Sequence, residues 1–207
     1  MADFLIAVAI SLLFFASFAA IELIKRKFNV SPEIMRRFAH MSSGCVVLLE
    51  YIYLPQVWVL VLLIGGGTLF FIASRLNLLT SVNDVTRVTY GQYVLTLGYL
   101  GAYILSLTEP RVFIPSILII TFGDSLAGLT GTLLKATSRT FLGSVVFFTV
   151  TYLILWQFSR VFTGTGDYLF LLYFVIAGLL TIIERLTPLG FDNLTVPVAA
   201  ALLLLSF

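Results

Sequence analysis

Residues 112–134 read VFIPSILIITFGDSLAGLTGTLL, an apolar run long enough to cross a membrane, and its one ionisable side chain is Asp124. An unpaired carboxylate in hydrocarbon is costly, so ionisable residues inside membrane helices usually serve a function. Helical residues spaced four, three and four apart share one face, and here these are Asp124, Gly128, Gly131 and Lys135. The stretch therefore predicts a membrane-spanning helix with an acid, two glycine gaps and a cation along one side.

The composition is that of an integral membrane protein. Of the 207 residues, 60% are hydrophobic and only 11% are charged, whereas a soluble domain carries about 25% charged residues. The apolar run 4–24 is too long for the hydrophobic region of a secretory signal peptide, so we expect no cleaved leader. A single cysteine, Cys45, and a single histidine, His40, exclude an internal disulfide and a multi-histidine zinc site.

Apolar runs near 20 residues predict seven spanning helices and a shorter eighth. The predicted segments are 3–24, 38–54, 56–73, 91–108, 112–134, 142–162, 168–186 and 194–207. The last is roughly 14 residues, or about 21 Å long, so it either crosses a thinned region or enters without crossing. The fold prediction is an all-α polytopic membrane protein with seven to eight transmembrane helices, forming one domain over residues 1–207.

The distribution of lysine and arginine predicts the orientation. With the N-terminus outside, ten of the twelve basic residues fall on the inner side, and only Arg111 and Arg160 fall on the outer side. The longest polar insert, 74–92, is also on the inner side and can form an interfacial helix carrying Asn83, Asp84 and Arg87. We therefore expect an active site that faces the cytoplasm.

The first polar motif is SPEIMRRFAH, residues 31–40, where a Ser-Pro pair indicates the start of a helix. Arg36, Arg37 and His40 fall within one turn at the inner membrane edge. The two arginines can be snorkelling anchors, but an anchor has no use for a histidine that lies deeper. Because guanidinium groups bind phosphate through paired hydrogen bonds, the motif favours a polyanion site.

The second motif is FGDSLAGLTG, residues 122–131. Its small residues permit close helix packing, which explains part of the pattern but not Asp124. A carboxylate on a glycine-faced helix can hold Mg²⁺ and let a phosphate chain approach the backbone. Structural pairing of Asp124 with an arginine is the alternative. The candidate phosphate-binding residues of this motif are Gly123, Ser125, Gly128 and Gly131.

The third and fourth motifs supply further cations, hydroxyls and acids. The loop KATSRTFLGS, residues 135–144, suits phosphate oxygens, although such a composition is also ordinary for a loop. Its candidate residues are Lys135, Arg139, Thr140, Gly143 and Ser144. Glu184 and Asp192 bracket a Pro/Gly loop at the inner face and can share a metal ion with Asp124. The plainer interpretation is that Asp192 and Asn193 cap the last helix.

No soluble nucleotide-binding motif is present in the sequence. The four motifs nevertheless hold the groups that phosphoryl transfer needs, since that reaction depends on positioning and charge neutralisation. A small channel or transporter would also carry acids inside the membrane. Such a protein would show a polar path through several helices, whereas the polar groups here cluster at one face of the membrane.

Together the motifs resemble those of the polyprenol kinase family, which comprises dolichol kinases, phytol kinases and CTP-dependent diacylglycerol kinases. The resemblance runs in order from residue 30 to residue 200 and includes a weaker segment at 87–92. The matching residues are Arg36, Arg37, His40, Gly123, Asp124, Ala127, Gly131, Arg139, Thr140, Gly143, Ser144, Glu184, Asp192, Asn193 and Leu194. The family motif has a glutamate where this chain has Leu142, so that contact is lost or supplied by Glu184 or Asp192.

The resemblance implies a membrane kinase that transfers a phosphoryl group from CTP to a lipid alcohol such as dolichol or phytol, with Mg²⁺ as the cofactor. It implies catalytic roles for Asp124, Arg36, Arg37 and His40, metal ligation by Asp124, Asp192 and Glu184, and nucleotide binding by the remaining candidates, including Asn193. A diacylglycerol kinase and a CTP:phosphatidate cytidylyltransferase-like enzyme are the alternatives. The expected partners are the lipid alcohol, CTP and the bilayer, with no nucleic acid, and a homo-oligomer is left open.

The depth of Asp124 sets a condition on the structure. Lys135 lies 11 residues further on, or about 16 Å at helical rise, so Asp124 lies well below the cytoplasmic surface if the helix is continuous. We therefore expect either a break in the helix near Gly123 or a water-filled opening. Such an opening should be lined by Arg36, Arg37, His40 and Asp192.

Overall fold

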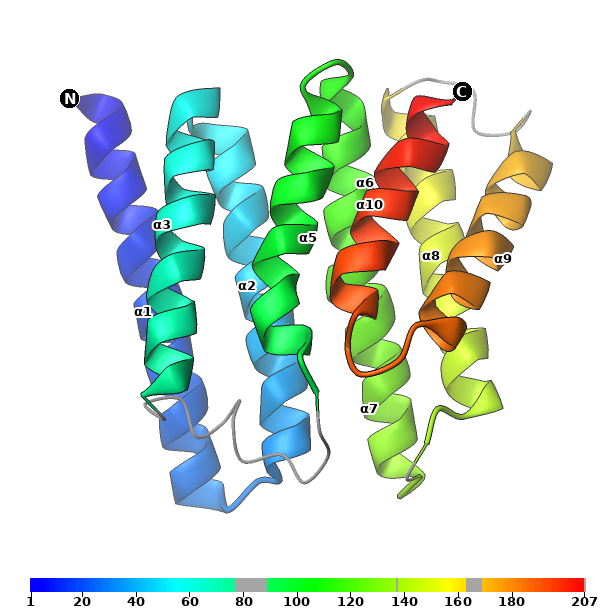
Figure 1. Ribbon diagram of the computed structural model, residues 1–207, viewed down its shortest axis with the longest axis horizontal. Coiled ribbons are helices and arrows are strands. Elements are labelled where there is room, and N and C mark those ends of the chain that lie inside the picture. The colour runs from blue at the N-terminus through cyan, green and yellow to red at the C-terminus, as the bar shows by residue number, and fades with distance from the viewer. Residues whose placement is uncertain (77–88, 137, 163–168, 207) are drawn as a thin grey trace. The chain divides into compact units, whose positions relative to one another are not determined.

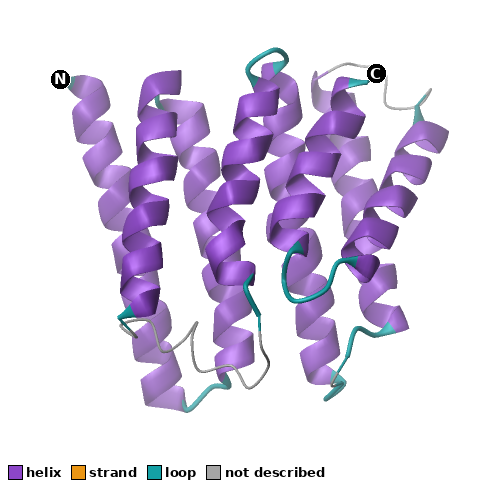
Figure 2. Cartoon of the chain, viewed as in Figure 1, coloured by secondary structure: helices purple, strands orange, loops and turns teal. Residues whose placement is uncertain are grey.

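The computed structural model describes residues 1–76, 89–136, 138–162 and 169–206. All regular structure in these ranges is helical, so the all-α prediction is confirmed for them (Figure 2). The chain divides into two compact units, Met1–Val88 and Thr89–Phe207, and each is described by itself. The predicted single domain spans both units and stays a prediction. The predicted interfacial helix with Asn83, Asp84 and Arg87 lies outside the described residues.

Over residues 1–76, which are the described part of the first unit, there are three helices: α1 (Ala2–Phe28), α2 (Pro32–Tyr53) and α3 (Gln56–Arg75). The core between α1 and α2 is apolar, and Phe70 of α3 packs against it; the buried members are Phe18, Ile21, Met35 and Ala39. The predicted start of α2 is confirmed, because the Ser31 hydroxyl accepts the N–H of Ile34 and a proline occupies the first helical position. The short link Leu54–Pro55 joins α2 to α3, as the sequence predicts.

The second unit is built around the run 110–133, with its helices side by side (Figure 1). In chain order its helices are α5 (Gly91–Ser106), a 3₁₀ turn (Pro110–Val112), α6 (Phe113–Leu118), a π-helical segment (Ile119–Asp124), α7 (Ser125–Leu133), α8 (Phe141–Phe162), α9 (Phe170–Leu186) and α10 (Asp192–Leu205). The run 110–133 is the central one, since 67% of its most apolar stretch is buried, against 22% for α8.

The helix that carries Asp124 is continuous but changes its hydrogen-bonding pattern, so of the two predicted alternatives the break near Gly123 is not found. Between Ile119 and Asp124 the backbone is π-helical, with one extra residue per turn, and α-helical geometry resumes at Ser125. Gly123 permits this arrangement to pack, because a Cβ atom there would stand 3.2 Å from the ring of Phe147 on α8. π-Helical segments of this kind are frequent at functional sites.

The helices α9 and α10 form a short hairpin. α9 has 17 residues and α10 has 14, which correspond to about 25 Å and 21 Å, less than a ~30 Å hydrocarbon core. In Figure 1 the ends of α9 and α10 that meet at their connecting loop stop short of the end of α7. The loop therefore turns alongside the central helix, at a level where side chains from three elements can meet.

The start of α5 holds this hairpin loop in place. The backbone N–H of Tyr90 donates to the carbonyl of Leu189 at 2.8 Å, and the Asn193 side chain donates to the carbonyl of Gly91 at 3.0 Å. Gly190 has φ +85°, a left-handed conformation that other residues rarely adopt, and a Cβ atom there would stand 2.6 Å from the backbone nitrogen of Gly91. These contacts fix the start of α5 against the loop between α9 and α10.

Among the described residues, four helical stretches are long and apolar enough to cross a membrane: Ala2–Phe28, Gln56–Arg75, Pro110–Leu133 and Phe141–Val161. α10 is a shorter apolar helix. These helices are compatible with an integral membrane protein. The predicted total of seven to eight crossings and the outside position of the N-terminus stay predictions.

Candidate active site

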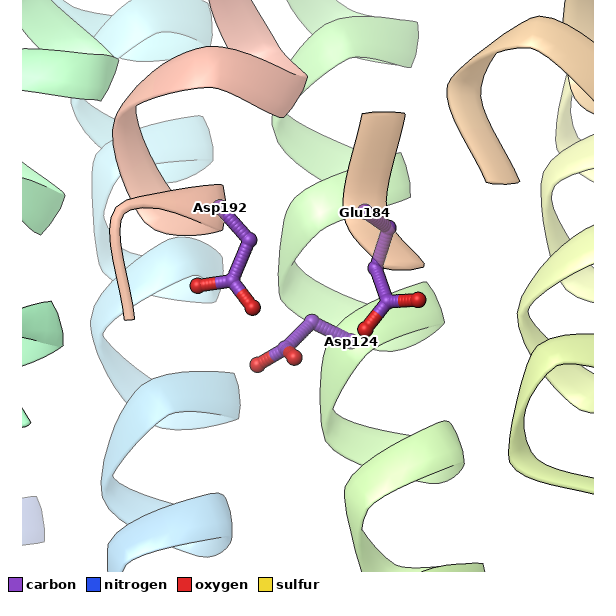
Figure 3. A group of neighbouring side chains, drawn as sticks. All are labelled: Asp124, Glu184 and Asp192. Atoms are coloured by element: carbon purple, nitrogen blue, oxygen red, sulfur yellow. The ribbon is translucent and has the colours of Figure 1, made fainter. Parts of the chain in front are cut away.

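Three carboxylates meet in the second unit. Asp124 at the end of the π-helical segment, Glu184 near the end of α9 and Asp192 at the start of α10 each offer an oxygen, and these oxygens lie within 4.8 Å of one another. Figure 3 shows the three side chains pointing toward a common space between their helices. All three are buried, at 5%, 6% and 6% exposure. The structure thus brings together the three acids that the sequence analysis selected as metal ligands.

Asp192 is placed by the start of α10, although it is not the N-cap. The N-cap is Phe191, which makes no side-chain cap bond, and Asp192 occupies the first helical turn. Its Oδ1 accepts the backbone N–H of Asn193 at 3.0 Å. The positive end of the helix dipole also favours a carboxylate here. The capping interpretation is therefore wrong in detail, because the side chain is directed to the cluster of acids.

Arg139, in the segment before α8, forms ion pairs with two of the three acids. Its Nε lies 3.1 Å from Oε1 of Glu184, and its Nη2 donates to Oδ2 of Asp192. Its Nη1 donates to the backbone carbonyl of Glu184, near the C-terminal end of α9. Arg139 is a predicted phosphate ligand, and its pairing with the two acids is not predicted, since nothing in the sequence relates residue 139 to residues 45 and 53 positions further on.

The residues present fit a divalent cation. Three buried carboxylates so close together repel one another when ionised, and buried charges need compensation. Carboxylate oxygens are the ligands that Mg²⁺ prefers, usually one or two of them together with water and phosphate oxygens. Asp124, Glu184 and Asp192 would hold such an ion. Metal binding itself stays a prediction.

Three of the candidate phosphate ligands before and within α8 have structural contacts. The Thr140 hydroxyl accepts the backbone N–H of Gly143 at 2.9 Å and so caps the start of α8. A Cβ atom on Gly143 would stand 3.2 Å from the carbonyl oxygen of Ala127, so glycine allows α8 to approach α7. The Ser144 hydroxyl accepts a hydrogen bond from Nη1 of Arg185 at 2.9 Å. Phosphate binding by these residues stays a prediction.

The helical face that was predicted to run from Asp124 to Lys135 ends earlier, because α7 stops at Leu133. Gly128 and Gly131 lie in α7, and a Cβ atom at Gly131 would meet nothing within 4 Å, so packing does not require glycine there. Ser125 is fully buried at the start of α7. Lys135 does not share the face, because α7 ends at Leu133 and Lys135 has φ +52°, in the left-handed region.

The Arg36, Arg37 and His40 motif lies in α2 of the first unit. The three side chains are buried, at 8%, 7% and 7% exposure, which argues against arginines that snorkel to the surface. Glu33, which the sequence analysis did not select, bridges the arginines: its Oε1 lies 2.9 Å from Nη2 of Arg36 and 3.7 Å from Nη2 of Arg37. The spacing of three and four residues could have revealed this contact. The predicted opening that these residues share with Asp192 stays a prediction, since it involves both units.

Asn193, a predicted nucleotide ligand, has its side-chain donor engaged in the fold. Its Nδ2 donates to the carbonyl of Gly91, and its Oδ1 is buried and accepts no hydrogen bond from the described residues. The backbone N–H of Asn193 donates to Asp192. Asn193 therefore links the start of α5 to the acid that α10 contributes.

Comparison with known proteins agrees with the sequence motifs. A phytol kinase of Synechocystis sp. is 28% identical over 197 residues, a match that covers 88% of this chain and 82% of that protein. No family model matches the chain, and no solved structure gives a significant match. The matched region includes almost the whole chain rather than one motif. Together with the ordered motifs, this similarity supports membership of the polyprenol kinase family, to which phytol kinases belong.

Proposed function

We propose that the chain is a membrane-embedded kinase that transfers the γ-phosphoryl group of CTP to the hydroxyl group of a prenol-type lipid alcohol such as phytol or dolichol. The observation that most strongly supports a phosphotransferase is the convergence of Asp124, Glu184 and Asp192 within 4.8 Å in a buried site. The similarity to a phytol kinase supports a lipid alcohol with a long apolar chain as the acceptor.

The transfer forms a bond between the hydroxyl oxygen and the γ-phosphorus and breaks the bond to the bridging oxygen of the nucleotide. The hydroxyl proton must leave in the same reaction. Asp124 is proposed either to accept this proton or to bind the cation. Mg²⁺, when bound, neutralises charge on the triphosphate. Glu184 and Asp192 are supporting acids. Further phosphate charge is neutralised by the proposed cationic set Arg36, Arg37, Lys135 and Arg139, with His40 orienting a phosphate or a carboxylate.

The proposed topology places the N-terminus outside, with seven to eight crossings and the site open to the cytoplasm. The short α9–α10 hairpin supports a site below the membrane surface, because its loop turns alongside the central helix (Figure 1). Backbone outside a helix is tolerated at membrane depth where it is buried in protein or lines a water-filled cavity. CTP would enter from the cytoplasm, and the lipid would enter sideways from the inner leaflet.

The test is a transfer assay with the purified protein in lipid nanodiscs, Mg²⁺ and a panel of phytol, dolichol and diacylglycerol. CTP labelled in the γ-phosphate should label the lipid, and CTP labelled in the α-phosphate should not. Label from the α-phosphate would mean transfer of the CMP unit and would identify a cytidylyltransferase instead. Competition by unlabelled ATP measures how strongly the protein prefers the cytosine nucleotide to the adenine nucleotide.

The decisive variant is Asp124→Asn, which keeps the shape of the side chain and removes its charge. It should abolish lipid phosphorylation while the protein still inserts and elutes as the folded species. The matched control is Glu109→Gln, because Glu109 is half-exposed, lies between α5 and the 3₁₀ turn and contacts Arg111 at 3.8 Å. Full activity in Asp124→Asn would refute the assignment.

A further inference from the structure

The three hydrogen-bonding edges of the Arg139 guanidinium are all directed to the ends of α9 and α10. Nε contacts Glu184 Oε1 at 3.1 Å, Nη1 donates to the Glu184 backbone carbonyl and Nη2 donates to Asp192. A planar guanidinium has five donors in a fixed fork, so one arginine can span acceptors on two helices. Arg139 therefore lies against two of the three carboxylates that would ligate a cation.

Both oxygens of Asp192 already accept hydrogen bonds. Oδ1 accepts the backbone N–H of Asn193 at 3.0 Å, and Oδ2 accepts from Arg139. A cation that binds Asp192 directly must share or replace one of these donors. The backbone N–H is fixed in the first turn of α10, whereas the Arg139 side chain is 29% exposed and precedes α8. Arg139 is thus the donor that can move away.

We propose that Arg139 is a built-in counter-ion that competes with a divalent cation for Glu184 and Asp192. In the absence of the cation the guanidinium compensates the charge of the two acids and holds them toward Asp124. When a divalent cation binds, it takes over that compensation and releases the guanidinium. The released fork is then available to phosphate oxygens, a step that rests on the proposed function. Arg139 is therefore a positioning residue that acts through Glu184 and Asp192.

Competition with a cation and a purely structural role of Arg139 predict opposite changes in cation affinity when the guanidinium is removed. If Arg139 merely tied α9 to α10, its removal would disorder the acids and weaken cation binding. If Arg139 competes with the cation, removal of its positive charge leaves the same carboxylates more attractive to a dication. Because charges at such short range interact strongly, Arg139→Gln should tighten cation binding by about tenfold or more.

The experiment measures Mn²⁺ binding to the purified, nucleotide-free protein in detergent, from the electron paramagnetic resonance signal of free Mn²⁺. Arg139→Gln should lower the Kd by about tenfold or more. Arg139→Lys retains the charge without the fork, so its Kd should fall between those of the wild type and Arg139→Gln. The matched control is Arg185→Gln, because Arg185 is exposed and hydrogen-bonded to Ser144, and its Kd should stay near that of the wild type. An unchanged or raised Kd in Arg139→Gln would overturn the proposal.

A second measurement applies if Arg139→Gln does not fold. The midpoint of thermal unfolding is recorded for the wild type and Arg139→Lys over a series of Mn²⁺ concentrations, since a ligand that binds the folded state raises it. Competition predicts a larger rise in the lysine variant, and an equal or smaller rise contradicts it. Neither measurement uses CTP or lipid, so a protein that fails the transfer assay but passes here would separate the two proposals.

Discussion

The carbonyl oxygen of Asn193 lies only 2.0 Å from the point where a Cβ atom on Gly98 would stand. α5 and α10 are therefore in backbone contact one residue beyond Asp192, and the contact exists only because residue 98 has no side chain. The same approach brings the Pro197 ring within 2.9 Å of that point. The packing of α5 thus fixes the position of the acid at the start of α10.

Gly98→Ala should displace the start of α10, because the atoms nearest to the new methyl group belong to the backbone of Asn193 and to the rigid Pro197 ring, which cannot rotate away. Overpacking of this kind costs about 1–3 kcal/mol, so the thermal unfolding midpoint in detergent should fall. Lipid phosphorylation should fall by more than the loss of folded protein alone would cause, since Asp192 moves with α10. Gly178→Ala in α9 is the matched control, because its Cβ atom would meet nothing within 4 Å and should leave the midpoint unchanged or higher. Equal effects of the two substitutions would contradict the close contact.

The parts of the fold that depend on local sequence could be predicted. The Ser-Pro start of α2 and the proline link between α2 and α3 are local signals, and both are present. The acids Asp124, Glu184 and Asp192 could be selected because carboxylates are expensive among apolar residues. The proximity of Glu184 and Asp192 could also be predicted, since these two acids flank a single loop.

The remaining features depend on packing between distant segments. The π-helical segment has no periodic signature in the sequence, and its extra residue is accommodated where Gly123 meets Phe147 of α8. The pairing of Arg139 with Glu184 and Asp192 joins segments separated by 45 and 53 residues. The departure of Lys135 from the helical face follows from a helix end at Leu133, which no glycine or proline marks.

The hydroxyl of Thr140 is predicted to act as a helix cap. Thr140→Val removes the oxygen that accepts the Gly143 N–H and should cost about 1 kcal/mol of stability. Thr140→Ser keeps the oxygen and should restore most of it. Unfolding midpoints of the two variants measure the cap, and the KM for CTP measures any phosphate contact. A valine variant with wild-type stability and a raised KM would show that the hydroxyl serves the nucleotide rather than the helix.

The left-handed conformation of Lys135 makes a glycine substitution favourable to the fold. The backbone N–H of Lys135 donates to Thr132 at 3.0 Å and that of Ala136 to Gly131 at 3.0 Å, a pair of bonds that usually places glycine at the left-handed position. Lys135→Gly should therefore raise stability by about 0.5–1 kcal/mol. The same variant should raise the KM for CTP if the ammonium group neutralises phosphate. Lys135→Asn, which tolerates the left-handed region, provides a second neutral variant, and loss of stability in both would contradict the assigned conformation.

The contact between Gly123 and Phe147 should control the geometry at Asp124. A methyl group at position 123 would stand 3.2 Å from two atoms of the fully buried Phe147 ring, so in Gly123→Ala either this ring shifts by a few tenths of an ångström or the π-helical segment adjusts its backbone. Either change re-aims Asp124, so lipid phosphorylation should fall at least about tenfold, with a loss of about 1–3 kcal/mol in stability.

Phe147→Leu shortens the opposing side chain and should by itself leave a small cavity, with a modest loss of stability. In that background Gly123→Ala should cost much less than in the wild type, because the methyl group then enters vacant space. A double-mutant cycle on unfolding midpoints and on lipid phosphorylation measures this coupling. Additive losses in the double variant would show that the two residues act independently and that the π-helical segment is maintained by other contacts.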